Sequence, residues 1–572
     1  MDDRWIPDSF AADGSQTIEA ADGQLAHRDH VAHTERFERR IERVRDGVWS
    51  VIGNGLSNQN FVEGPEGLIA IDTGESVEEM RWALDAVREE TAAPVVAVIY
   101  THFHYVAGTA AIPGAGDAVP VWGHERIVAN RRRVGVELGP VATRGLIHQF
   151  GILLPPDGPD GLVNVGLGLD FRRAEHAPFT NGFVAPTDTI GEPTTMTLAG
   201  LQVEVTPAPS DADDSVTIWF PELGVAINNL AWPALFNVFP IRGEEYRDPR
   251  VLLTGFDHLL ALGADHLVGA HGPPVSGRAE IARELTLARD AIQYLWDQTV
   301  RGLNKGYTLG QLTGLVQLPD VYRSTYFTQQ LYGLVEHHVK QIHSGLRGWF
   351  DGDEATLFPL QPAERAARLV ERLGGADAVR AEVAEAIRSD DLRWALELAS
   401  WLVRRHGDGP VDAEDSASLG SALRVVAQRT TSANVRNWSL TRALELDGRL
   451  DLTRFRVHRF QRELVASTPP TAIVHGLAVV LDPDAAIDLD VEVRWRFSGG
   501  STTGLHLRNG VAAPTSGDDA AIEVSIDEAV WPDLVAGKLP FDEAVGSGSV
   551  VVTGDDGLLR TVLGCLDFPG FA

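Results

Sequence analysis

The first part of the chain alternates short apolar runs with a helical repeat. Residues 47–73 contain strand-like runs separated by Gly, Asn and Pro. Beyond them Met80, Leu84 and Val87 recur at the spacing of one helical face. The run at 95–100, VVAVIY, is continuously apolar and is followed by polar residues, which is typical of a buried strand. This order of strand, helix and strand predicts an α/β layered fold whose site lies beyond the strand ends.

The pattern then changes along the chain and suggests further domains. Strand-like runs resume after a loop-rich stretch, so residues 41–278 are predicted to form one α/β domain. Residues 279–425 are helical in pattern, with Gly and Pro at the helix ends, although the acidic stretch 406–420 favours an exposed loop. Strands and turns alternate again in a small α+β domain over 455–572. Residues 1–40 are polar, and we expect a solvated extension rather than a metal-binding tail.

Charge and cysteine content narrow the function classes. The 572 residues include 80 acidic and 49 basic side chains, a net charge of −31, and such a surface repels nucleic-acid phosphates. We therefore expect no nucleic-acid partner, although one buried arginine can still create a site for a small anion. No apolar run reaches the ~18 residues of a membrane span. The single cysteine, Cys565, excludes an intrachain disulfide and a Cys-rich zinc site. With no export signal at the N-terminus, a cytoplasmic location is predicted.

The segment YTHFHYVAGTAA, residues 100–111, carries the clearest chemical signal. His102 and His104 are two residues apart directly after the apolar run, so on an extended backbone they share one face. Two imidazoles placed in this way can bind one metal ion. Two loop histidines are often only exposed polar groups, but the preceding IDTG turn and His271 in a later Gly/Pro turn strengthen the metal interpretation.

Several segments together resemble one known family. They are NFVEGPEGLIAIDTG, PVVAVIYTHFH, FNVFPIRGEEYRDP, GAHGPPVSG and YLWDQTVRGLNKGYTLGQL. In these the chain resembles the metallo-β-lactamase superfamily, and more closely its alkylsulfatase branch. The resemblance implies an αβ/βα sandwich, then an all-α dimerisation domain, then a small sterol-carrier-like α+β domain. It also implies a homodimer.

The chain departs from the family at the metal ligands. The family's metal loop reads Thr-His-x-His-x-Asp-His, but Val106 and Ala107 occupy the Asp and last His positions. A family glutamate before SVTIWF is replaced within PSDADDS, where Asp211 is the nearest substitute and Ser210 the alternative. The family's bridging glutamate is replaced by an asparagine pair that ends at Asn229.

These losses bear on how many ions can bind. Two divalent ions a few ångströms apart repel each other, and anionic ligands normally offset that repulsion. We therefore predict one divalent ion, held by His102, His104 and either Asp211 or His271. Zinc is the expected metal, and iron is the alternative because two histidines and a carboxylate also form the non-haem iron triad. With no metal, the histidines would be polar groups in a binding cavity. The remaining alternative is a metal pair completed by ligands that the sequence does not reveal.

Three further residues are predicted to act on the substrate. The resemblance places Arg242 at the family's sulfate-contacting arginine, and its planar donor fork suits an oxyanion or a carboxylate. The alternative for Arg242 is a structural salt bridge with Asp248 or Glu244. Tyr105 and Asn229 are the other predicted catalytic residues, and the alternative for Tyr105 is a hydrogen bond that supports the fold.

The resulting prediction is an alkylsulfatase-like metallo-hydrolase with a depleted metal site, acting on a small amphiphilic anion. Two alternatives remain open on the same scaffold. One is a diverged single-metal enzyme, such as a non-haem iron oxygenase or a lyase, and the other is a non-catalytic binder of apolar ligands. Fold does not choose among them. Measurements of metal content, metal identity and released sulfate distinguish these alternatives.

Overall fold

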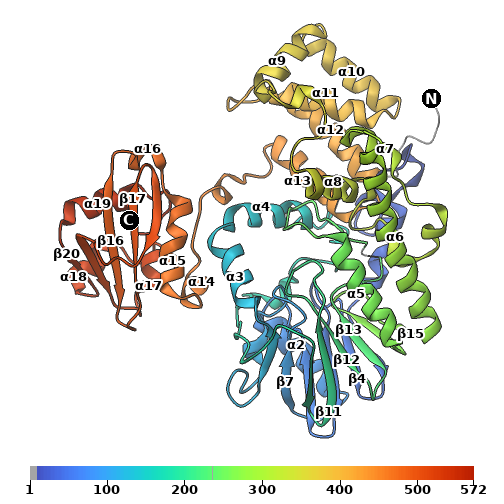
Figure 1. Ribbon diagram of the computed structural model, residues 1–572. Coiled ribbons are helices and arrows are strands. Elements are labelled where there is room, and N and C mark those ends of the chain that lie inside the picture. The colour runs from blue at the N-terminus through green and yellow to red at the C-terminus, as the bar shows by residue number, and fades with distance from the viewer. Residues whose placement is uncertain (1–8, 235, 572) are drawn as a thin grey trace. The chain divides into compact units, whose positions relative to one another are not determined.

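A computed structural model describes residues 9–234 and 236–571. Its contacts divide the chain into two units (Figure 1). The first comprises residues 1–127 and 145–451, and the second comprises residues 128–144 and 452–572.

Two facing sheets form the centre of the first unit. The seven-stranded sheet runs in chain order, antiparallel through its first four strands and parallel from β6 onward. Its strands are β3 (Arg40–Arg45), β4 (Val48–Ile52), β5 (Gln59–Gly64), β6 (Gly67–Ile71), β7 (Val95–Ile99), β8 (Val121–His124) and β9 (Asp188–Ile190). The six-stranded sheet consists of β10 (Thr194–Leu198), β11 (Leu201–Pro207), β12 (Val216–Phe220), β13 (Val225–Asn228), β14 (His266–Gly269) and β15 (Val275–Ser276).

Alternation along the strands explains how the two sheets bury both of their faces. In β6, Ile69 and Ile71 pack between the sheets, whereas Leu68 and Ala70 face the outer helix layer. Successive strand residues point to opposite faces, so a strand that is apolar throughout must be covered on both sides.

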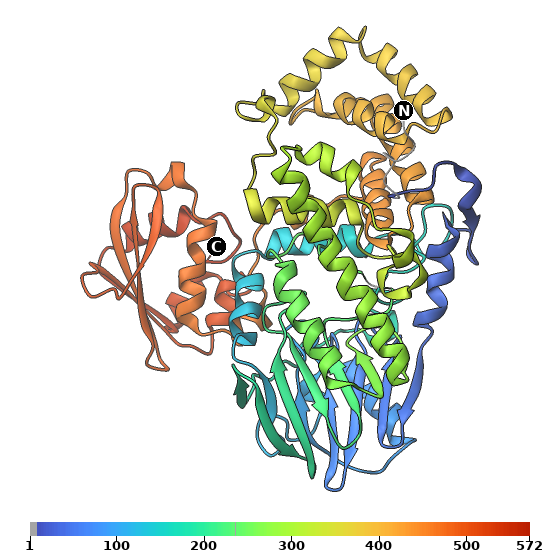
Figure 2. The ribbon, with the colours of Figure 1, turned by 45° about the vertical axis from the view of Figure 1, so that its right-hand side comes forward.

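Helices supply that cover. Helix α2 (Val77–Arg88) packs on the seven-stranded sheet, and the side chain of Ser76 caps its first turn. Helices α5 (Pro249–Leu262) and α6 (Arg278–Asn304) cover the other sheet, as Figures 1 and 2 show. The αβ/βα sandwich predicted from the sequence is therefore confirmed.

The helical region is less regular than its sequence pattern suggested. It contains α7 (Leu309–Leu315), α8 (Val335–Arg347), α9 (Pro362–Arg372), α10 (Ala376–Arg388), α11 (Leu392–Arg404), α12 (Ala413–Arg429) and α13 (Ala433–Leu446). Residues 316–334 form only short 3₁₀ turns between irregular stretches, a segment that Pro319 and Gly333 punctuate. In the opposite direction, α12 begins within the stretch 406–420 that was predicted to be a loop.

The expectation of a solvated N-terminal extension is wrong for the described residues 9–40. They form β1 (Thr17–Glu19), β2 (Leu25–His27) and α1 (Arg28–His33). His33 is buried and bonds through its two ring nitrogens to the Tyr326 hydroxyl at 2.8 Å and to the Gly166 carbonyl at 2.9 Å. Residues 1–8 lie outside the described part. The polar pattern misled for His33 because its hydrogen-bond partners, Gly166 and Tyr326, are distant in the sequence.

The second unit is an α+β domain. Its sheet has the strand order β18-β17-β16-β19-β20, and Trp495, Trp531 and Phe571 lie in its core. The strands are β16 (Asp490–Phe497), β17 (Thr502–Arg508), β18 (Val511–Thr515), β19 (Ile522–Ile526) and β20 (Val550–Thr553). Its helices are α14 (Arg462–Ala466), α15 (Pro470–Gly476), α16 (Pro483–Ala486), α17 (Trp531–Val535), α18 (Phe541–Ser547) and α19 (Asp556–Gly564).

Two helices from the first third of the chain belong wholly or partly to the second unit. Helix α3 (Ile127–Val136) lies almost wholly in the second unit, where Val136 joins the core beside Phe460. Helix α4 (Gly139–Phe150) begins in the second unit and ends in the first. Among the described residues, none of the helices combines the length and apolar character that a membrane crossing requires.

Candidate metal centre

The loop that follows β7 begins with a chain of hydrogen bonds that orients His102. The backbone N–H of Thr101 donates to Asp72 at 2.8 Å, and its hydroxyl donates to the other carboxylate oxygen of Asp72 at 2.6 Å. The Thr101 oxygen lies 2.9 Å from Nδ1 of His102. Because the hydroxyl proton goes to Asp72, Thr101 accepts from Nδ1–H of His102. The Nε2 lone pair of His102 therefore remains available for a metal ion.

Three donor atoms converge in front of that lone pair. Nε2 of His102 lies 3.1 Å from Nδ1 of His104. Oδ2 of Asp211 lies 3.6 Å from the first of these atoms and 3.3 Å from the second. Four ligands at about 2.05 Å around a tetrahedral zinc ion lie about 3.3 Å from one another. The three side chains thus form one face of a zinc-sized coordination shell and leave a further position open.

The charges of the cluster suit a cation. Burial lowers the pKa of His102 to about 3, so its imidazole is neutral at physiological pH. Burial opposes ionisation of Asp211, but His102, His104 and Arg247 together hold its pKa well below the ordinary value. Burial also raises the pKa of Asp72 to about 7, against the hydrogen bonds from Thr101.

His271 lies beside this group of three rather than within it. Its Nδ1–H donates to the Leu56 carbonyl at 2.9 Å, which leaves Nε2 as an acceptor, and burial lowers its pKa to about 4. The ring of Tyr105 lies 5.2 Å from the ring of His271 and 5.1 Å from that of His102. Burial raises the pKa of Tyr105 well above its ordinary value, so its hydroxyl stays neutral. Of the two alternatives for the third ligand, the compact arrangement favours Asp211 over His271.

The residues that replace the family's metal ligands make other interactions. Val106 is buried in the core that packs against α2, and the backbone N–H of Ala107 donates to the Gly74 carbonyl at 3.0 Å. Asn229 donates through Nδ2 to Oδ1 of Asp211 at 2.6 Å. Asn229 therefore orients a metal ligand, while its Oδ1 has no hydrogen-bond partner among the described residues. Ser210, the alternative to Asp211, instead donates its hydroxyl to the backbone carbonyl of Asn229.

A cluster of two arginines and one carboxylate adjoins the histidines. The guanidinium of Arg242 pairs with Glu244, and Arg247 pairs with the other carboxylate oxygen. The Glu244 oxygen that pairs with Arg242 also lies 3.8 Å from Nε2 of His104. Burial lowers the pKa of Arg242, but Glu244 and the other neighbours raise it by a larger amount. The pKa of Arg242 is therefore raised overall.

Sequence reasoning named Arg242 and gave Glu244 only as a salt-bridge alternative. The ion pair with Glu244 is present, whereas Asp248 caps α5 and pairs with Arg250. Arg247 was missed altogether. The run RGEEYR, in which two acidic residues lie between two arginines, was the signal that could have found both Glu244 and Arg247.

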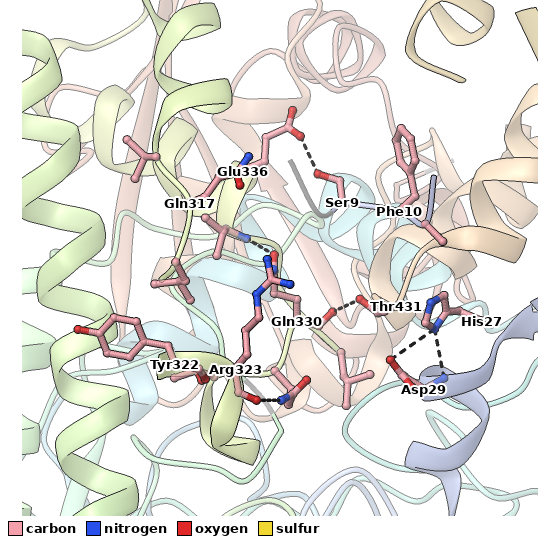
Figure 3. Close-up of a pocket in the computed structure, with 17 residues that line it drawn as sticks. Ser9, Phe10, His27, Asp29, Gln317, Tyr322, Arg323, Gln330, Glu336 and Thr431 are labelled. Carbon is pink, nitrogen blue, oxygen red and sulfur yellow. Dashed lines mark hydrogen bonds and ion pairs between the residues drawn. The ribbon is translucent and has the colours of Figure 1, made fainter. Parts of the chain in front are cut away.

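Two other features of the first unit are separate from this centre. A cavity of about 320 Å³ lies between the N-terminal segment and residues 316–336, and it shares no lining residue with the histidine cluster (Figure 3). Its Ser9 and Glu336 are hydrogen-bonded to each other at 2.7 Å. Elsewhere His406, the exposed Asp412 and the buried Asp415 come together, but Arg405 pairs with both carboxylates.

Known proteins match the chain over nearly its whole length. Residues 308–449 match the family model described as alkyl sulfatase dimerisation, and residues 460–572 match the model described as alkyl sulfatase C-terminal. A linear primary-alkylsulfatase from Pseudomonas is 33% identical over 527 residues, which cover 89% of this chain and 98% of that protein. An (R)-specific secondary-alkylsulfatase from Pseudomonas is 29% identical over 92% of this chain and 80% of that protein.

A solved structure agrees with these matches. The stereoselective inverting sec-alkylsulfatase Pisa1 from Pseudomonas superposes with a TM-score of 0.86 at 27% identity, covering 96% of this chain and 88% of that one. The shared architecture, the two family models and a relative one-third identical over almost all of its length give one answer: this chain belongs to the alkylsulfatase family.

Proposed function

We propose that this protein is a single-metal alkylsulfatase, which hydrolyses the sulfate monoester of a small amphiphilic alcohol to the alcohol and hydrogen sulfate. The observation that carries the proposal is the triangle of donor atoms from His102, His104 and Asp211, with edges of 3.1–3.6 Å. Membership of the alkylsulfatase family supports the reaction class, and the linear and secondary alkyl sulfates named for its relatives are the first substrates to test.

His102, His104 and Asp211 would hold the ion, with zinc as the proposed metal and iron as the alternative. A divalent zinc ion at such a site supplies a Lewis acid and a bound water whose pKa is near neutral. Asn229 holds the Asp211 carboxylate in place by its hydrogen bond of 2.6 Å. The ring of Tyr105 lies beside the rings of His102 and His271, and we propose that its neutral hydroxyl donates a proton to the oxygen of the departing group.

The anionic end of the substrate would bind at the arginine pair. The chain carries a net charge of −31, so the surrounding field disfavours anions. Arg242 and Arg247 bring two positive charges against the one carboxylate of Glu244. The Nε atoms of both arginines are buried with no hydrogen-bond partner among the described residues. An unpaired buried donor is costly, and a sulfate oxygen would satisfy it.

We also propose that the protein works as a homodimer, because residues 308–449 match a dimerisation domain. In the helical region Leu295, Tyr332 and Leu334 are buried within the chain, so they are not available for a dimer surface, whereas Tyr307 is exposed. Trp349 and Phe358 are instead 74% and 96% exposed, and we assign the interface to their segment. The single cysteine fits a reducing compartment, so a cytoplasmic location is part of the proposal.

The test joins elemental analysis with turnover. Protein purified without added metal is assayed for bound zinc and iron and is then incubated with primary and secondary alkyl sulfates. Ion chromatography measures released sulfate. Reaction in ¹⁸O-labelled water shows whether the C–O or the S–O bond breaks. One metal equivalent and sulfate release are expected. A metal-loaded protein that releases no sulfate from either substrate class would contradict the proposal.

A further inference from the structure

Glu244 contacts both halves of the site. Its Oε1 pairs with Arg242 and lies 3.8 Å from Nε2 of His104, and its Oε2 pairs with Arg247. The Glu244 side chain is only 12% exposed. Glu244 was not among the metal ligands or catalytic residues expected from the family resemblance.

The first consequence concerns the metal. With a metal ion held beside Asp211 and His102, Nδ1 of His104 would turn its lone pair to the ion and the proton would lie on Nε2. A carboxylate facing the Nε2–H group fixes that tautomer and raises the basicity of the imidazole. Glu244 is the carboxylate that faces it. A gap of 3.8 Å is longer than a hydrogen bond, so the contact is incomplete while Oε1 also serves Arg242.

The second consequence concerns the anion. Arg242 is the cation to which the sulfate group would bind, and Glu244 already occupies some of the N–H donors of its guanidinium. A sulfate oxygen and the Glu244 carboxylate compete for the same charge-assisted hydrogen bonds. Arg247 lets Glu244 leave Arg242 without becoming an unpaired buried charge, because the second carboxylate oxygen stays bound.

We propose that Glu244 is a positioning residue that exchanges partners: the sulfate group of the substrate displaces it from Arg242, and the released oxygen moves onto Nε2–H of His104. The sulfate half of this inference rests on the proposed function. In this arrangement Glu244 weakens binding of the anion but strengthens the metal site. Glu244 thereby couples binding of the anion at Arg242 to the strength with which His104 holds the metal.

The experiment uses Glu244→Gln, which removes the charge and keeps the shape. Zinc affinity is measured by competition with a chromophoric chelator, using the metal alone. Octyl sulfate affinity is measured by calorimetry on the metal-free, full-length protein. The variant is expected to bind zinc 10–100-fold more weakly and octyl sulfate about tenfold more tightly than wild type. Glu245→Gln removes the same charge from the exposed adjacent residue and is expected to change neither affinity.

Opposite shifts support the proposal because a merely structural role would weaken both affinities together. Parallel losses, or no change in either affinity, would overturn it. If Glu244→Gln does not fold, Glu244→Asp keeps the charge but shortens the reach to His104, and a zinc affinity equal to wild type would then refute the positioning role. The zinc arm needs no turnover, so it remains decisive even if the protein hydrolyses no sulfate ester.

Discussion

Asp211→Asn is the sharpest probe of the metal centre. Asp211 supplies the only carboxylate of the three converging donors, and Asn229 already holds it at 2.6 Å. Asparagine keeps the size of the side chain but removes the negative charge. Its amide group also places a second NH₂ donor near Asn229, unless the side chain turns its oxygen that way. We therefore expect the metal to lose a ligand while the fold stays intact.

The magnitude follows from the number of ligands. Zinc held by a complete protein site gains about 10 kcal/mol or more. Sharing about 10 kcal/mol among three protein donors gives roughly 3 kcal/mol each, which corresponds to about 150-fold in affinity. The carboxylate is the only anionic donor, so its loss should exceed that share, and we expect the zinc affinity of Asp211→Asn to fall by about 200–1,000-fold.

Competition with a chelator of known affinity measures this loss, and elemental analysis after dialysis gives the number of ions per chain. Asp213→Asn is the matched control, since it removes the same charge two residues away from a side chain that pairs with Arg126 at 2.6 Å. The control should bind one zinc ion as wild type does. If Asp211→Asn stays within threefold of wild type, or if wild type retains two ions per chain, the three-donor site is wrong.

Three further results are expected. Arg242→Ala should weaken octyl sulfate binding to metal-free protein by about 100-fold in calorimetry, while Arg242→Lys should restore only part of it; an unchanged affinity in both would remove Arg242 from the anion site. Light scattering should show wild type at the mass of two chains and Trp349→Glu or Phe358→Glu shifted toward one chain, whereas the exposed Val511→Glu should not shift. Burial raises the pKa of Glu79 to about 8, so the native state keeps a proton that the unfolded chain releases, and stability should fall as pH rises from about 4.5 to 8. Glu79→Gln should lack that loss, so between pH 5 and pH 8 the stability of wild type should fall by roughly 3–4 kcal/mol more than that of the variant. Denaturant unfolding measures this difference, and parallel pH curves would contradict it.

The layered fold could be predicted because its signals are local. The run VVAVIY is apolar at every position since β7 is covered on both faces, and the residues after it stand at a strand end. The pair His102 and His104 follows from that placement. Asp211 could be predicted too, because it is the nearest carboxylate to a position where the family resemblance requires one.

The misses share a different cause, since each depends on contacts between residues far apart in the chain. His33 lies in a polar segment that is typical of solvent-exposed chain, but its hydrogen-bond partners are Gly166 and Tyr326. Residues 316–334 have a composition that permits helix, and their tertiary contacts hold them in short turns instead. Glu244 is acidic and near Arg242 in sequence, which suggests only a local salt bridge. Its approach to His104 depends on two segments 140 residues apart meeting at one end of the sandwich.

The burial of His102 has a consequence for the rate at which metal enters and leaves. Its side chain is completely buried, while the side chains of His104 and Asp211 are 18% and 9% exposed, so solvent reaches the cluster of donors on the side of His104 and Asp211. Exchange must then wait for local opening around His104 and Glu244, a motion slower than ligand exchange in water. We expect metal loss to a chelator to be limited by that opening and to be independent of chelator concentration. The metal content of a purified sample would then record which ion was present as the chain folded.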